Sequence, residues 1–374
     1  MEQVSTFEFH KNNPNESVNK YIKRKRVELS HEIRKSKKIY LDTNYWILLR
    51  DAHTKENVDD RIVKLLRLIE SLVKSGHAVC PISTDTFWEI QKQCDVDTLK
   101  ATVKIIDDLS KGVAIISLPE RFNFELIYFV RTRLKHPVYF PDEIIWTKIP
   151  YILGFVTPVS ETLPPDIDKA IQKAFIDHMW VLNLKDMYKQ LLQGPTISPP
   201  DYTALSKILN RNKYEHINDH ISFKQLFLAE IAGILDIYKH DFESLMAYLY
   251  ESETSNIVSK EEIIASKHSQ YLANIIYDMF SHNKITTEFP SLHVMAKIHA
   301  AARWDKKRQF KPNDLYDFHH AIDAIPYYDY FLTDHSLRHL VNQEIMGFDA
   351  ISHCKTISGI DDAISELSQI ATTK

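Results

Sequence analysis

The sequence predicts an α/β fold: a doubly wound α/β/α domain with a central parallel sheet, interrupted by a large all-α insertion. Three observations lead to this prediction. Strand and helix patterns alternate over residues 36–118, the alternation returns over 291–374, and between them apolar residues recur at helical spacing. Alternating strands and helices are typical of a parallel sheet covered by helices, so the two outer parts are expected to form one domain.

The first part, residues 36–118, contains three strand patterns, each followed or preceded by an amphipathic helix pattern. Gly76 and Gly112 each follow a helix pattern and precede a strand, as expected of glycines that end helices. Ser83 and Thr84 are good helix N-caps. The expected elements are strands at 38–42, 77–82 and 113–118, and helices at 44–50, 58–74, 84–89 and 97–111.

The insertion, residues 119–290, shows no convincing strand pattern and is rich in Phe, Tyr, Leu and Ile. Its expected helices span 122–134, 165–192, 204–210, 223–251 and 260–281. In the second part, residues 291–374, helices are expected at 291–307, 314–325 and 335–341, and strands at 328–332 and at either 348–352 or 355–358.

Composition excludes several classes of enzyme. The chain of 374 residues has seven glycines, and the closest two, Gly347 and Gly359, are 12 residues apart. Dinucleotide fingerprints, phosphate-binding loops and serine-hydrolase elbows all need glycines within a few residues of each other. Any catalysis is therefore expected to rely on side chains or metal ions.

Cysteine content and hydropathy indicate the cellular environment. The three cysteines, Cys80, Cys94 and Cys354, form no CxxC pair, which is typical of proteins from a reducing compartment. No apolar stretch resembles a signal peptide or a membrane span. We therefore expect a cytoplasmic protein that does not associate with a membrane.

Positive charge is concentrated near the N-terminus although the net charge is −4. Residues 1–35 form a polar and basic arm, and nine Lys or Arg stand against two Glu between residues 20 and 38. This segment is either the solvated face of a helix or an arm that binds nucleic-acid phosphates. The candidate phosphate-binding residues there and in the second part are Lys23, Arg24, Lys25, Arg26, Lys306, Lys307 and Arg308.

Four acidic residues stand at strand ends or on the helices that follow. Asp42 and Asp334 each close an apolar strand, Glu89 follows the second strand, and Asp317 lies near the start of a helix. Ligands of open α/β sheets bind at the carboxyl ends of the strands. Each acid taken alone could equally cap or complement a helix.

The four acids together favour a metal site. Clustered carboxylates cannot all ionise without a compensating cation, and ligand sets made only of oxygen select Mg²⁺ or Mn²⁺. Such a site suits phosphodiester hydrolysis. Asp314 is a further acid that is either a metal ligand or a helix cap. His320, one turn after Asp317, is either a packed histidine or a contact to phosphate.

These motifs resemble those of PIN-domain nucleases. The opening motif is Ile39-Tyr-Leu-Asp42-Thr-Asn44, and Glu89 matches the second acid of that family. Asp317-Phe-His-His-Ala-Ile-Asp-Ala and Tyr330-Phe-Leu-Thr333-Asp334 resemble the third and fourth motifs. The resemblance implies that Asp42, Glu89, Asp317 and Asp334 are catalytic metal ligands, and that Asn44 and Thr333 orient the first carboxylate.

The resemblance also implies an activity, a Mg²⁺- or Mn²⁺-dependent endoribonuclease, with a role as a toxin or antiphage effector as one interpretation. Two alternatives stay open: an inactive PIN-like scaffold that binds RNA or protein, and a nuclease acting on DNA. The long gap between Glu89 and Asp317 departs from compact members of the family. The insertion is therefore a candidate surface for a protein partner or for a second copy of the chain.

Overall fold

The computed structural model describes residues 6–93, 95–191, 200–254, 259, 261–262, 268–284 and 287–371. Cys94 and the first five residues of the N-terminal arm lie outside the described residues. So do parts of two expected helices, at 192 and within 260–267. None of the described helices is both long enough and apolar enough to cross a membrane.

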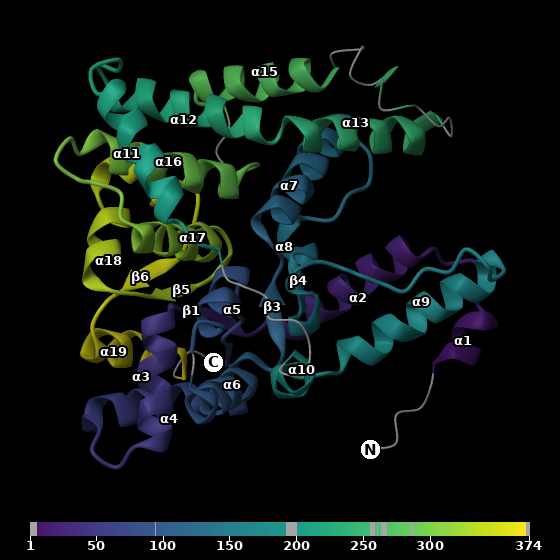
Figure 1. The fold of residues 1–374 in the computed structure, drawn as a ribbon, viewed down its shortest axis with the longest axis horizontal. Helices are drawn as coiled ribbons and strands as arrows, with labels where there is room; N and C mark the ends of the chain where they lie inside the picture. Colours follow the sequence, from purple (N-terminus) through teal and green to yellow (C-terminus); the bar gives the residue numbers. More distant parts are fainter. Residues whose placement is uncertain are drawn as a thin grey trace.

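The centre of the fold is a four-stranded parallel sheet with the strand order β2-β1-β5-β6, which confirms the mixed α/β class. Segments far apart in the sequence form it, because β1 pairs with β5 in the register Leu41↔Leu332 (Figure 1). The strands are β1 (Lys37–Leu41), β2 (Ala78–Val79), β5 (Tyr330–Leu332) and β6 (Lys355–Ile357).

Helices cover both faces of this sheet. Side chains alternate along a strand, so Ile39 and Leu41 face one helical layer and Tyr40 faces the other. The first layer contains α3 (Thr43–Thr54), α4 (Asp60–Lys74), α5 (Thr84–Ile90), α6 (Val96–Ser110) and α19 (Ile360–Ile370). The second layer contains α2 (Val18–Ile33), α16 (Pro290–Trp304), α17 (Pro312–Tyr327) and α18 (His335–Val341).

Helix α4 illustrates how local sequence sets these elements. The Asp59 carboxylate accepts a hydrogen bond from the backbone N–H of Arg61 at 2.9 Å and so caps the helix start. Gly76 follows the helix end with φ +77°, a left-handed conformation that favours glycine. Between these ends, apolar residues at helical spacing are buried against the sheet: Leu65, Leu66, Ile69, Leu72 and Val73.

The expected third strand forms, but it pairs differently from the prediction. β3 (Val113–Ile115) pairs antiparallel with β4 (Trp146–Lys148), and a parallel bridge between Ile82 and Ala114 links it to the chain that follows β2. The prediction that 119–290 is entirely helical is therefore wrong at β4. Three residues carry too little alternation to show a strand, and their partner lies far away in the sequence.

The other elements that the structure describes in the insertion are helices, and four of them build a core against α16. Val294 and Ile298 of α16 pack toward the sheet, while Leu292, Ala296 and Ala300 pack toward the insertion. That core unites α7 (Leu118–Arg133), α12 (Phe223–Ile237), α13 (Lys239–Thr254) and α15 (His268–Ser281) (Figure 1). The remaining elements of this segment are α8 (Pro141–Ile144), η1 (Ile149–Tyr151), α9 (Pro165–Trp180), α10 (Leu184–Leu191) and α11 (Thr203–Glu215).

The N-terminal arm folds as α1 (Phe7–Lys11) and α2, which lie beside α9 (Figure 1). Asp177 of α9 receives hydrogen bonds from the Thr6 hydroxyl at 2.7 Å and from the Tyr21 hydroxyl, and its carboxylate lies 2.8 Å from His10 Nε2. One carboxylate thus holds both arm helices against the insertion.

Candidate functional site

Asp42 and Asp334 occupy matching positions on neighbouring strands. Asp42 follows β1 and begins α3, where its Oδ1 accepts the Tyr45 backbone N–H at 3.1 Å. Asp334 follows β5 and begins α18, where its Oδ1 accepts the Leu337 N–H at 2.8 Å. Both are therefore helix caps, and in each the second carboxylate oxygen remains outside the cap.

Glu89, on α5, is held by a buried histidine. The Nε2 of His320 lies 2.7 Å from Glu89 Oε2, and its Nδ1 lies 2.6 Å from the Tyr40 hydroxyl. The Thr43 hydroxyl donates to the same glutamate oxygen. His320 is only 2 % exposed, so this histidine is packed in the interior and joins β1, α5 and α17.

The protonation of His320 follows from these contacts. Burial opposes its positive charge, but the hydrogen bond and charge of Glu89, with the charges of Asp85 and Asp42, raise the pKa of His320 to about 9. At neutral pH both ring nitrogens therefore carry protons, one donated to Glu89 and the other to the Tyr40 oxygen. His320 is a fixed cation inside the acidic cluster.

Asp317, one turn before His320 on α17, is in the opposite situation. Its carboxylate makes no hydrogen bond or ion pair with any residue that the structure describes. Burial raises the pKa of Asp317 to about 7; the charge of His320 opposes this shift, and the charges of Asp334, Asp42 and Glu89 add to it. Asp317 is therefore close enough to Asp334, Asp42 and Glu89 to be affected by their charges.

The two supporting residues differ in placement. Thr333 is 1 % exposed, and its buried hydroxyl has no partner at normal hydrogen-bond geometry, although it lies beside Asp42 and helps to lower the pKa of that carboxyl. Burial is the stronger influence and raises the pKa of Asp42 above its usual value. Asn44 is exposed on the first turn of α3 and makes no side-chain hydrogen bond with a described residue.

Asp314 is placed as a helix cap and not among the four acids. Its Oδ2 accepts the Lys311 backbone N–H at 3.0 Å, at the start of α17. Its Oδ1 lies 3.5 Å from Nη2 of Arg308. Of the two roles expected for Asp314, the structure therefore supports the cap and gives no support to metal ligation.

The basic arm uses much of its charge within the protein. Arg26 is 1 % exposed and pairs with Glu120 at 2.7 Å. The prediction that Arg26 binds a phosphate is therefore wrong, because its side chain is not accessible. Arg24 pairs with Glu16 at 3.1 Å and Glu28 at 2.7 Å. Lys25 lies 3.5 Å from Asp177, and Lys23 donates to the Tyr248 hydroxyl at 3.3 Å. In the second part, Lys306 and Lys307 are exposed after α16.

Several residues near the acids were not predicted from the sequence. Tyr40 links His320 to the Ser83 hydroxyl, with 2.8 Å between the two oxygens. Asp85 lies 2.9 Å from His319 Nδ1. Tyr40 has a signal that sequence analysis could have used: two positions before Asp42 on a strand, it must share a side of the sheet with that residue and face α17.

The four acids have the oxygen donors that a divalent cation prefers, but their arrangement is not that of a complete metal site. Each of the four carboxylates keeps at least one oxygen that no described residue engages, and oxygen donors are those that Mg²⁺ and Mn²⁺ prefer. Among the described residues, however, no group of three or more His, Cys, Asp or Glu is arranged to hold a metal ion. The ion pair between His320 and Glu89 occupies one of the expected donors.

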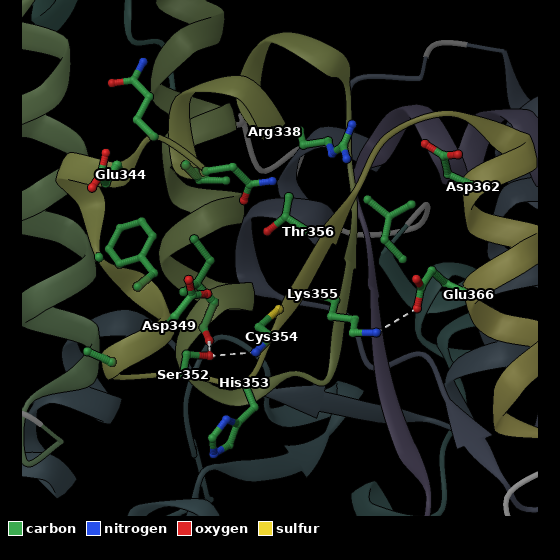
Figure 2. A pocket seen from close by; sticks show the side chains of 18 of the residues that line it. Arg338, Glu344, Asp349, Ser352, His353, Cys354, Lys355, Thr356, Asp362 and Glu366 are labelled. Carbon is green, nitrogen blue, oxygen red and sulfur yellow. Dashed lines mark hydrogen bonds and ion pairs between the residues drawn. The ribbon is translucent and has the colours of Figure 1, made fainter.

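A large cavity lies away from the four acids. It has a volume of about 1050 Å³ and lies at the free edge of β6, between α18 and α19 (Figure 2). Both acids and bases line it, and Lys355 pairs with Glu366 at 2.9 Å. None of the four acids lines this cavity, so size alone does not locate the candidate site.

Comparisons with protein-family models, with curated proteins and with solved structures found no match to this chain. The interpretation of the site therefore depends on its own geometry and on the sequence motifs.

Proposed function

We propose that this protein is a metal-dependent nuclease that hydrolyses phosphodiester bonds, with RNA as its substrate. The observation that carries the proposal is the placement of Asp42 and Asp334 at the carboxyl ends of the adjacent strands β1 and β5, with Asp317 close enough to be affected by their charges and by that of Glu89 on α5. A carboxylate without a partner in such a place costs free energy unless a cation joins it. The motif resemblance to PIN-domain nucleases supports RNA as the substrate.

The residues divide into fixed and adaptable donors. Asp42 and Asp334 are held by their caps at the ends of adjacent strands and would present one oxygen each to a divalent cation. Asp317 would present its unpartnered carboxylate, and Glu89 would present the carboxylate oxygen that His320 and Thr43 leave free. When bound, Mg²⁺ or Mn²⁺ supplies an activated water molecule and neutralises charge on the phosphate.

His320 and Tyr40 serve as positioning residues in this proposal. The His320 imidazolium holds Glu89 in place from the buried side, and the Tyr40 hydroxyl fixes the other ring nitrogen. Their role is to limit the orientations that Glu89 can adopt. A carboxylate that is held in advance loses less entropy when it binds a ligand.

A second candidate is an inactive PIN-like scaffold that binds RNA or protein. The observation that favours it is the same ion pair, because His320 already neutralises Glu89 and no metal-holding group is formed among the described residues. A nuclease acting on DNA is the third candidate, since the metal chemistry does not depend on the sugar.

The proposal is tested by incubating the pure protein with labelled RNA and labelled DNA, in Mg²⁺, in Mn²⁺ and in EDTA. We expect RNA cleavage that requires metal, leaves a 5′-phosphate and a 3′-hydroxyl, and falls by about 100-fold or more in Asp42→Asn. Asp314→Asn is the matched control on α17 and should keep most of the activity. Cleavage that survives EDTA or Asp42→Asn would refute the proposal, and cleavage of DNA alone would favour the third candidate.

A further inference from the structure

A smaller cavity next to the acidic cluster has a different chemical character. It has a volume of about 320 Å³ and lies between the end of α16, the loop that follows it and α18. Such a volume is near the lower end of the roughly 300–1,000 Å³ of small-ligand pockets. The lining residues that matter for the argument are Phe223, Trp304, Arg308, His335, His339 and Gln343.

Trp304 gives the cavity an accessible aromatic face. It is 41 % exposed at the last position of α16, and its ring meets the edge of Phe223 from α12 at 6.1 Å between centroids. Phe223 thus supports the tryptophan from one side. Exposed aromatic rings of this kind are the platforms on which the bases of single strands stack.

Donors suited to phosphate surround the ring. His335 and His339 lie one turn apart on α18, and Arg308 enters from the loop, held by Asp314 at 3.5 Å. His335 also lies 3.4 Å from the Ser358 hydroxyl. Asp305 is the one acid among the residues that line this cavity, and its Oδ1 already accepts the Lys307 N–H at 3.0 Å.

The chain connects the cavity to the acidic cluster. His335, which lines the cavity, directly follows Asp334, a proposed metal ligand at the start of α18. A second cavity, of about 370 Å³, is also lined by Trp304. Its lining includes Lys306, which follows α16, and His220, which lies between α11 and α12. Trp304 belongs to both cavities.

We propose that the cavity beside α18 binds one nucleotide of a single-stranded nucleic acid. The base stacks on Trp304, the phosphates contact His335, His339 and Arg308, and the strand continues toward the second cavity on the insertion. The location of the cut next to this subsite rests on the proposed nuclease function, whereas binding itself does not. The insertion then extends the substrate-binding surface of the α/β domain.

The test is fluorescence anisotropy with short labelled RNA and DNA oligonucleotides of the same sequence, in EDTA so that no metal-dependent cleavage occurs. Loss of stacking on one base weakens binding about 5- to 150-fold, and this is the effect expected for Trp304→Ala. Trp304→Phe should restore most of the affinity. Tyr271→Ala removes an exposed aromatic side chain of α15 and should bind like the wild type.

The salt dependence of binding tests the phosphate contacts. His339→Ala should weaken binding by removing a hydrogen-bond donor to phosphate, and Arg308→Gln should lower the slope of log affinity against log salt by about 0.7, the value for one charged contact to a phosphate of a single strand. Thermal melting of each variant confirms that it folds. Stronger binding of RNA than DNA would assign the subsite to RNA, and equal binding would assign it to either nucleic acid; both support the proposal.

Three results would overturn the subsite. The first is no binding of either oligonucleotide by the wild type, and the second is unchanged affinity in both Trp304→Ala and His339→Ala. The third is displacement of the labelled RNA by poly-glutamate as effectively as by unlabelled RNA. The last would show a general anion surface. Because these assays contain no metal, a protein that binds as expected but never cleaves would refute the nuclease proposal and leave the subsite intact.

Discussion

The two halves of α17 carry carboxylates in contrasting surroundings. In the first half, Asp317 faces other acids at the strand ends and has no described partner. In the second half, Asp323 is 3 % exposed and pairs with Arg121, whose Nη1 also donates to the Ile116 carbonyl at 2.8 Å. The same helix thus holds one carboxylate that is paired with a buried cation and one that has no described partner.

The difference between Asp323 and Asp317 separates a charge that stabilises the fold from a charge that does not. A buried ion pair is a structural element, costly to break from one side. A partly buried carboxylate without a partner destabilises the protein when it ionises, so its presence is best explained by a ligand that compensates it. Three substitutions test this contrast.

The largest effect on the free energy of unfolding is expected at the buried ion pair between Arg121 and Asp323. Arg121→Ala should lower the free energy of unfolding by about 3–5 kcal/mol, because it leaves the Asp323 carboxylate buried without its cation. Urea denaturation followed by circular dichroism measures this loss. Arg24→Ala, which removes a half-exposed pair with Glu28, is the control and should cost less than about 1 kcal/mol. Equal losses in the two variants would remove the distinction.

The opposite sign is expected at Asp317. Asp317→Asn should raise the free energy of unfolding by roughly 1–3 kcal/mol at pH 8 without metal, a value discounted for partial exposure. The pKa is about 7 in the folded protein and near 4 when unfolded. The folded state therefore holds a proton between these values that the unfolded state releases, and wild-type stability falls as pH rises through this window.

The variant should lose that part of the pH dependence. Urea denaturation of both proteins between pH 5 and pH 8 measures it, and the two stabilities should converge at the acid end. If Asp317→Asn is less stable than the wild type at every pH, Asp317 has a structural partner and the contrast within α17 is wrong.

The smallest effect is expected at Asp314, three residues before Asp317. Asp314→Ala should lower the free energy of unfolding by about 0.5–1 kcal/mol, because α17 loses the carboxylate that accepts the Lys311 N–H. Metal-dependent cleavage should persist, since this acid lies outside the cluster. Loss of cleavage with the fold intact would place Asp314 in the site after all.

The fold was predictable wherever the signal is local. Ser83 and Gly76 mark helix boundaries that the structure contains, with the Ser83 side chain accepting the Thr86 N–H and Gly76 in a left-handed conformation. Strand pairing was less predictable, because β4 has three residues and a distant partner. The prediction of one helix over 223–251 was also wrong, since the helix is interrupted at Tyr238 between α12 and α13.

The sequence shows which acids follow strands, but it does not show which residues those acids contact. Asp42 and Asp334 are indicated by strands that end in a carboxylate, a pattern that the chain shows directly. Asp314 and Asp317 stand three residues apart near the start of the same helix, so the sequence does not distinguish their roles. The contacts of Asp314 with Lys311 and Arg308 identify it as the helix cap. In the same way, the charge of Arg26 is visible in the sequence, whereas its burial against Glu120 is not.

The central claim is that the carboxylates at the strand ends bind a divalent cation. Calorimetric titration of the metal-free protein with Mn²⁺ tests it most directly, beside Asp317→Asn and the Asp314→Ala control. We predict saturable binding of one or two ions by the wild type and by Asp314→Ala, and binding weakened at least about tenfold in Asp317→Asn. Absence of saturable binding by the wild type, or equal affinity in Asp317→Asn, would contradict the account.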